Sequence, residues 1–211
     1  MRWVQAAFFL LIVRPLLALV LGVNLRHAEH LPSHGPAILA ANHNSHLDTL
    51  LLMNLYPLTQ LHRLRPVAAA DYFLKNRLLA WFALNIMRIL PLARRPKCGA
   101  APLAHIEAAL AQGDILILFP EGSRGEPEQR SALKTGIAHL MEFAPGVPVV
   151  PIYLHGLGKA LPKGDWLPIP FFADGFVGEP LTWQGSRAAT MASLEAAFTE
   201  LQQQGKHHAW E

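Results

Sequence analysis

A short apolar run that ends in a cluster of polar residues constrains this chain more than any other feature. Residues 36–41 read Pro-Ala-Ile-Leu-Ala-Ala, and residues 42–48 follow at once as Asn-His-Asn-Ser-His-Leu-Asp. The length and composition of the run are typical of a strand that is buried on both faces. Asn44 or Ser45 can cap a helix over the apolar residues 47–55. The sequence therefore predicts a buried strand, a tight polar turn and a helix.

This turn brings an imidazole and a carboxylate within reach of each other. His43 falls at the carboxyl end of the predicted strand, and Asp48 falls in the first turn of the helix. A carboxylate beside an imidazole fixes its tautomer and stabilises the imidazolium, which leaves the other ring nitrogen to take a proton from a hydroxyl group. An Asp in a first helical turn also interacts favourably with the helix dipole. The pattern alone is equally consistent with a structural pair and a catalytic pair.

A second block repeats the arrangement of apolar run and polar loop. Residues 115–118 read Ile-Leu-Ile-Leu, and residues 119–124 read Phe-Pro-Glu-Gly-Ser-Arg. Together with the His-x4-Asp spacing of His43 and Asp48, this hexapeptide resembles two of the four sequence blocks of the glycerolipid acyltransferases, the family of 1-acylglycerol-3-phosphate acyltransferases. The resemblance implies that His43 is the general base and that Asp48 orients it.

The resemblance also assigns the loop after the second run to substrate binding. Gly122 permits backbone geometry that lets main-chain amides approach an anion, and Ser123 stands in the same loop. Arg124 adds charge-assisted hydrogen bonds to a phosphate. Glu121 would accept a hydrogen bond from a glycerol hydroxyl or fix an active-site arginine, with a structural salt bridge as the alternative.

Three basic residues outside these two blocks are further candidates for a phosphate site. The family carries Gly-x-x-Phe-Ile-Asp-Arg where this chain has residues 85–94, and only the arginine matches, as either Arg94 or Arg95. These arginines can bind a phosphate bidentately; the alternative is a solvated basic loop near a membrane surface. Lys134 lies in a Lys-x-Gly triplet that commonly follows the glutamate block, in a helix predicted to begin at Ser131, and a surface lysine is its alternative.

Asn42 and His46 flank the predicted base and are secondary candidates for shaping the site. His43, His46 and Asp48 could also form part of a zinc site. No fourth ligand is evident, however, and the block at residues 119–124 has no use in a metal hydrolase. A metal hydrolase remains the rival enzyme class, but we expect no metal. We expect no cofactor either, because a thioester donor already supplies an activated acyl group.

The fourth block of the family resembles residues 147–153, which read Val-Pro-Val-Val-Pro-Ile-Tyr. Proline cannot donate a hydrogen bond to a neighbouring strand, so a strand with prolines at its start and within it belongs at an edge or an irregular position of a sheet.

Residues 3–23 are apolar over about the length that crosses a bilayer. Arg14 and Pro15 interrupt them midway, and both a buried charge and a missing backbone donor disfavour a spanning helix there. Two short helices lying in one leaflet are at least as well supported as one spanning helix. A signal peptide and a helix packed on the domain are the remaining alternatives. The family resemblance favours a membrane anchor.

Composition limits the functions open to the chain. Of 211 residues, 52% are hydrophobic, which is high for a soluble protein and indicates apolar surface facing something other than water. The net charge of +3 suits anionic lipid headgroups or phosphorylated substrates, and no nucleic-acid motif is present. Cys98 is the only cysteine, so an intrachain disulfide is excluded and a reducing compartment is expected.

These inferences combine into one expected molecule. The fold is an α/β domain with a central mixed β-sheet surrounded by helices, preceded by an apolar membrane-associating segment; residues 1–25 form the anchor and residues 26–211 the acyltransferase domain. The reaction is acyl transfer from acyl-CoA or acyl-carrier protein to a lysophospholipid hydroxyl, first of all 1-acylglycerol-3-phosphate to give phosphatidic acid, at the cytoplasmic face of the inner membrane. Another lysolipid acceptor, or an inactive lipid-binding or scaffold protein in the membrane, is the alternative.

Overall fold

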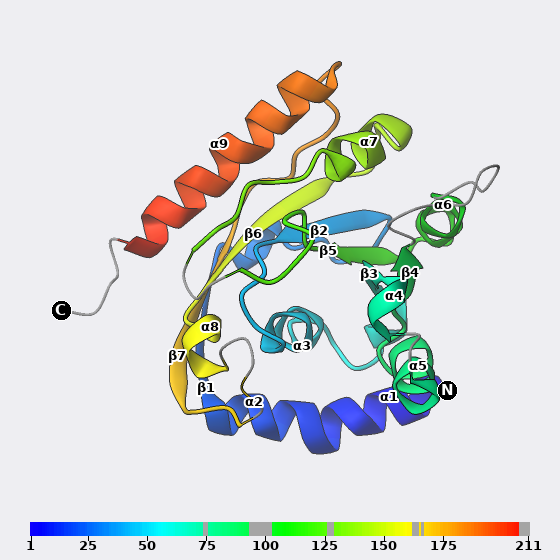
Figure 1. Cartoon of the computed structure of the whole chain (residues 1–211), viewed down its shortest axis with the longest axis vertical. Helices are drawn as coiled ribbons and strands as arrows, with labels where there is room; N and C mark the ends of the chain where they lie inside the picture. Colours follow the sequence, from blue (N-terminus) through cyan, green and yellow to red (C-terminus); the bar gives the residue numbers. More distant parts are fainter. Residues whose placement is uncertain (74–75, 93–102, 126–128, 162–164, 166, 207–211) are drawn as a thin grey trace.

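A single mixed sheet organises the chain. The computed structural model describes residues 1–73, 76–92, 103–125, 129–161, 165 and 167–206. Within these residues, seven strands pair in the order β1-β7-β6-β2-β5-β3-β4 (Figure 1). The strands are β1 (Leu21–Arg26), β2 (Ala37–Ala41), β3 (Leu64–Ala69), β4 (Leu90–Leu92), β5 (Ile115–Leu118), β6 (Val149–His155) and β7 (Phe171–Val177). The block from β6 to β4 is parallel, whereas β7 is antiparallel to β6, so the mixed sheet is confirmed.

Helices cover both faces of the sheet. They are α1 (Arg2–Phe8), α2 (Arg14–Val20), α3 (Leu47–Asn54), α4 (Ala70–Phe73), α5 (Arg77–Asn85), α6 (Ala104–Ala111), α7 (Gly136–Phe143), α8 (Leu157–Ala160) and α9 (Arg187–Lys206). Figure 1 shows α6, α7 and α9 on one face and α3 on the other, with α1 and α2 running beyond α3. The sheet therefore separates two large apolar cores, and a third, smaller cluster consists of Tyr153, Phe176 and Leu201.

Strand β2 belongs to both cores. All of its residues are buried, because helices lie over each face of the sheet. Leu39 packs in the core shared with α3 and the N-terminal helix, while Ile38 packs in the core under α6, α7 and α9. The predicted buried strand and the helix that follows it are both present.

Pro151 lies in β6, a central strand, at an irregular position. On one side β6 pairs with β2 through Pro151 itself. On the other side the pairing with β7 begins only at Ile152, and a separate bridge joins Val149 to Leu181. Between them the Gly178 amide donates to the Pro151 carbonyl at 2.8 Å. The break in the ladder accommodates a residue that has no N–H to donate.

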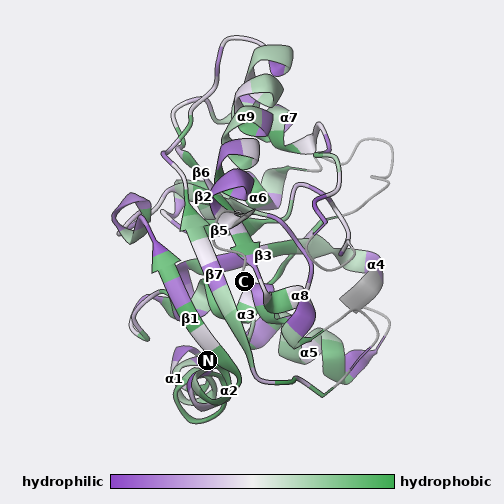
Figure 2. Ribbon diagram, turned by 90° about the vertical axis from the view of Figure 1, so that its left-hand side faces the viewer, coloured by the Kyte–Doolittle hydropathy of each residue, from purple (hydrophilic) through white to green (hydrophobic). Residues whose placement is uncertain are grey.

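The N-terminal apolar segment forms one helix of 19 residues, Arg2–Val20, rather than two separate helices. A π-helical turn, Phe9–Val13, joins α1 to α2, and Pro15 follows directly in α2, so the residue without an N–H stands next to the place where the α-helical ladder is already interrupted. The helix is long and apolar enough to cross a membrane. In Figure 2 it lies at the base of the domain and is coloured mainly as hydrophobic.

One stripe of this helix packs on the domain. Phe9, Val13 and Leu17 are at most 2% exposed. The Arg14 guanidinium donates to the Asn54 side-chain oxygen at 3.3 Å and to the Tyr56 carbonyl at 3.4 Å. The charge that interrupts the apolar sequence therefore points toward α3 and the loop after it.

The helix leads directly into β1, which pairs with β7 in parallel. Leu21 lies opposite Phe171, and Arg26 lies opposite Phe176. The boundary expected between residues 25 and 26 falls inside this strand, which is part of the sheet.

Candidate active site

The topology brings the two sequence blocks to one edge of the sheet. Strands β2 and β5 are parallel neighbours, with Ala40 opposite Leu118. His43 follows β2 and Glu121 follows β5, so both lie beyond the carboxyl ends of adjacent strands. Ligands bind at this edge in open α/β sheets.

His43 and Asp48 are in direct contact. The Nδ1 atom of His43 lies 2.9 Å from Oδ2 of Asp48, so the geometry assigns the Nδ1–H tautomer. The same oxygen accepts from the amides of Asn44 at 2.8 Å and Ser45 at 2.9 Å. Asp48 is 1% exposed, and a carboxylate held by three donors in this position fixes both the ring and the turn that carries it. Nε2 is the ring nitrogen on the side away from Asp48.

Phe119 fixes the plane of the imidazole. Its ring stacks on His43 with a centroid distance of 4.0 Å and an interplanar angle of 18°. The sequence analysis gave Phe119 no role, although it is the first residue of the hexapeptide; its place at the end of β5 was the available signal. Asp48 and Phe119 together leave the ring little freedom to rotate.

Glu121 holds the main chain of the site. It is 2% exposed; one oxygen accepts from the His43 amide at 3.1 Å and the other from the Ser131 amide at 3.0 Å. Burial raises the pKa of this carboxyl, and the hydrogen bonds from Ser131 and His43 oppose that rise. Neither interpretation offered by the sequence, a glycerol hydroxyl or a charged partner, anticipates these two amides.

Gly122 and Lys134 are packed against each other. Gly122 has φ +75°, and a Cβ placed on it would lie 2.5 Å from the Lys134 ammonium nitrogen. The backbone angle favours glycine at this position, and any larger residue would also displace the Lys134 ammonium. Ser123 is exposed and Arg124 is half-buried beside them. Two cations consequently lie close to the His43 turn.

The segment before α7 has no regular secondary structure, although a helix was expected from Ser131. The helix begins at Gly136. The amides of Ser131 and Leu133 donate to the carboxylates of Glu121 and Glu195, and the Lys134 amide donates to the Pro120 carbonyl at 2.8 Å. These contacts hold residues 129–135 against the site, and we refer to this segment as the strap.

Asn42 and His46 occupy different environments. The buried Asn42 side chain bonds both the amide and the carbonyl of Leu154, at 2.6 and 2.8 Å, and so ties the end of β2 to β6. His46 is exposed. Partial desolvation of its ring lowers the pKa of His46, and the positive charge of Arg124 and the nearby His43 lower it further.

Arg94 and Arg95 lie outside the described residues. Among the residues that the structure does describe, no three His, Cys, Asp or Glu side chains come together to hold a metal ion.

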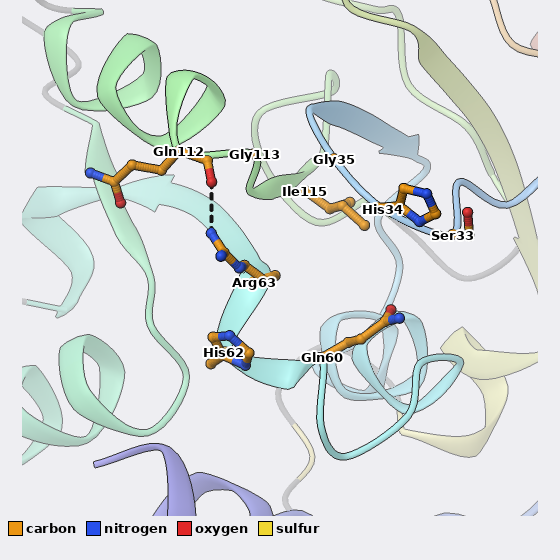
Figure 3. A pocket seen from close by; sticks show the side chains of 9 residues that line it. All are labelled: Ser33, His34, Gly35, Gln60, His62, Arg63, Gln112, Gly113 and Ile115. Atoms are coloured by element: carbon orange, nitrogen blue, oxygen red, sulfur yellow. Dashed lines mark hydrogen bonds between the residues drawn. The ribbon is translucent and has the colours of Figure 1, made fainter.

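A cavity of about 450 Å³ opens at the opposite edge of the sheet. It lies between the loops that precede β2, β3 and β5, and its lining includes His34, His62 and Arg63 (Figure 3). Arg63 donates to the Gln112 carbonyl across it at 2.6 Å. The cavity is remote from His43 because amino and carboxyl ends of parallel strands lie at opposite edges.

A family model described as Acyltransferase matches residues 22–155, more than half of the chain. The chain belongs to the acyltransferase family. In this acyltransferase-family chain the matched segment runs from β1 to the end of β6 and contains His43, Asp48 and the hexapeptide.

Curated relatives agree with this assignment. The chloroplastic 1-acyl-sn-glycerol-3-phosphate acyltransferase of Arabidopsis thaliana is 31% identical over 145 residues, which cover 68% of this chain and 38% of the relative. The alpha form of the human 1-acyl-sn-glycerol-3-phosphate acyltransferase is 30% identical over 137 residues, 63% of this chain and 45% of the relative. The chain thus spans less than half of the length of these relatives.

A solved structure shares the fold. The crystal structure of the 1-acyl-sn-glycerophosphate acyltransferase from Thermotoga maritima matches with a TM-score of 0.74, covering 100% of this chain and 81% of the other, at 20% sequence identity.

Proposed function

We propose that this protein transfers a fatty acyl group from a thioester to the free hydroxyl of a lysophospholipid, with 1-acylglycerol-3-phosphate as the acceptor and phosphatidic acid as the product. The observation that carries the proposal is the His43–Asp48 contact at the carboxyl edge of the sheet, with Phe119 stacked on the ring. An imidazole held at Nδ1 by a carboxylate is suited to accept a proton at Nε2.

The reaction needs one base and no acyl-enzyme. Nε2 of His43 takes the proton of the acceptor hydroxyl as the oxygen attacks the thioester carbonyl. A carbon–oxygen bond forms, the carbon–sulfur bond breaks, and the imidazolium returns the proton to the departing thiolate. Asp48 stabilises the imidazolium between these two steps.

The phosphate of the acceptor would meet the cations beside the turn. Arg124 lies near His46 and Lys134 lies over Gly122, and Arg94 or Arg95 would add a further guanidinium. Ser123 is exposed in the same loop and would complete the site. The weak match of residues 85–94 to the family block favours a different lysolipid as the alternative acceptor.

The partners follow from the substrates. The donor is acyl-CoA or acyl-carrier protein, and because the thioester carries the activated acyl group the reaction requires no cofactor. The apolar face of the N-terminal helix would hold the protein at the cytoplasmic face of the membrane, where both a lipid acceptor and a soluble thioester are available.

The proposal is tested with purified protein in lipid micelles. The measurement is the release of free thiol from long-chain acyl-CoA or acyl-carrier protein in the presence of a panel of lysolipids. Turnover with lysophosphatidic acid is expected, and His43→Ala should lower kcat by about two to four orders of magnitude, the usual contribution of general base catalysis. His34→Ala is the matched control, since this exposed histidine lies at the opposite edge of the sheet.

The outcomes separate the alternatives. Turnover only with another lysolipid would identify that lysolipid as the acceptor and leave the proposed acyl-transfer mechanism unchanged. An active His43→Ala variant would overturn the mechanism, and a wild-type protein inactive with every pair would favour a lipid-binding or scaffold protein.

A further inference from the structure

The strap, residues 129–135, connects the site to the C-terminal helix. On the side facing the site, the Ser131 amide donates to Glu121, whose other oxygen holds the His43 amide. The Lys134 amide donates to the Pro120 carbonyl, which places the ammonium group over Gly122. The strap thus contributes to the position of a cation and, through Glu121, to the main chain of the proposed base.

On its other side the strap is held by a single carboxylate. Oε2 of Glu195 on α9 lies 2.7 Å from the Arg130 guanidinium, and Oε1 accepts from the Leu133 amide at 3.4 Å. Both contacts are made by one side chain and by residues only three positions apart in the strap.

Burial of the arginine makes this contact different from an ion pair between two exposed side chains. Exposed pairs contribute little to stability because water screens them. Here the Glu195 side chain is 39% exposed, but that of Arg130 is only 13% exposed, and its guanidinium lies 5.6 Å from the centroid of the Phe198 ring. Leu133 and Phe198 are packed in the same core. Arg130 and Leu133 therefore fix the strap to α9 from a well-packed position.

We propose that Glu195 is a positioning residue for the acceptor site. It acts through the strap by holding Arg130 and the Leu133 amide. This keeps the Lys134 ammonium over the Gly122 loop and the Ser131 amide in position to donate to Glu121. This inference rests on the proposed function, since the acceptor is the substrate whose phosphate Lys134 would meet. Glu195 lies beyond the segment matched by the family model, which ends at residue 155.

The kinetic test compares Glu195→Gln with Glu200→Gln, an exposed glutamate on the same helix. Glutamine keeps one acceptor but presents an NH₂ group to the second donor, so the strap loses one contact. The KM for lysophosphatidic acid should rise about tenfold in Glu195→Gln if the loss of one charge-assisted contact is expressed at the acceptor site, while the KM for acyl-CoA stays close to that of Glu200→Gln.

A double variant separates positioning from general loosening. If Glu195 acts on the acceptor through Lys134, the KM for lysophosphatidic acid in Glu195→Gln combined with Lys134→Ala should equal that of Lys134→Ala alone. Additive increases in this KM, or equal increases in the KM values for both substrates, would overturn the proposal.

Amide hydrogen exchange gives a readout that does not require activity. In Glu195→Gln, peptides covering residues 129–135 and 41–45 should exchange faster than in wild type, with no change in Glu200→Gln. Unchanged exchange in Glu195→Gln would overturn the proposal even if the wild-type enzyme is active. If the wild-type protein shows no turnover but Glu195→Gln still exchanges faster, the role of Glu195 in holding the strap is supported and only the proposed function is refuted.

Discussion

At the scale of single residues, two buried carboxylates hold the main chain around the proposed base. Asp48 binds the His43 ring and the amides of Asn44 and Ser45, and Glu121 binds the amides of His43 and Ser131. The imidazole is thus fixed by its ring and by its backbone. Precise placement of reacting groups accounts for a large part of enzymatic rate, so both carboxylates should affect turnover.

Glu121→Gln tests this role. The variant has one acceptor and one donor where the structure has two acceptors, so one main-chain amide loses its partner. We expect kcat to fall by about tenfold or more. Glu179→Gln is the control, because Glu179 is exposed beyond β7. Wild-type kcat in Glu121→Gln would contradict a role for this carboxylate in positioning the base.

His46 should make stability depend on pH near neutrality. Its pKa is lowered in the folded protein, so the unfolded chain binds the proton more readily. Above about pH 6.5, the unperturbed pKa, His46 is neutral in both the folded and the unfolded state and does not affect stability. As the pH falls from there through the lowered pKa of the folded state, the unfolded chain takes up the proton first and the free energy of unfolding decreases.

NMR titration of His46 and urea unfolding at pH 7.5 and 5.0 check this prediction. Wild type should lose more stability on acidification than His46→Asn does. An equal loss in both proteins, or a titration of His46 above pH 6.5, would contradict it.

At the scale of elements, local signals predicted more than distant ones. The His43–Asp48 pair was predictable because five residues of strand, turn and helix determine it. The irregular conformation of the strap was not, since its amides donate to Glu121 and Glu195, and main-chain partners leave no pattern in a sequence. The pairing of β1 was missed for the same reason: its partner β7 is 150 residues away. The functional roles of the site residues stay predictions.

Gln5 offers a prediction for the N-terminal helix. The side chain is 1% exposed, and within the described part of the chain neither of its amide atoms has a hydrogen-bond partner. A buried amide without partners costs free energy that an apolar side chain of similar size does not. Gln5→Met should therefore raise the free energy of unfolding by about 1–2 kcal/mol.

Urea unfolding of Gln5→Met checks this, with the exposed Gln203→Met on α9 as the control. A less stable Gln5→Met would mean that the amide makes a hydrogen bond that methionine cannot replace.

At the scale of the whole molecule, exposed apolar side chains gather on one side. The N-terminal helix and α5 touch through Phe8 and Phe82, whose rings meet edge to face at 5.2 Å. Large side chains on these two elements are exposed, among them Trp3, Leu10, Leu11, Leu19, Leu78 and Trp81. Apolar area of this extent on helices suits contact with lipid, and it lies on the side of the sheet away from α9.

Vesicle binding tests which side faces the membrane. Leu11 and Leu19 are 71% and 80% exposed, and Leu11→Gln with Leu19→Gln should weaken co-sedimentation with anionic vesicles about tenfold, since each leucine would bury apolar area in the interface. Phe143→Gln is the control, because Phe143 is exposed on α7 over the opposite face of the sheet. Equal binding by both variants and wild type would exclude this face.

The pairing of β1 with β7 also sets the order of events during synthesis. Leu21 can pair with Phe171 only after Phe171 has been synthesised, and at the rate of translation the interval between the two residues is on the order of ten seconds. Throughout this time the apolar helix before β1 has left the ribosome while the strand that anchors it has not been made. A lipid surface or a chaperone can therefore engage the helix first, and β1 joins the edge of the sheet only afterwards, once β7 is available.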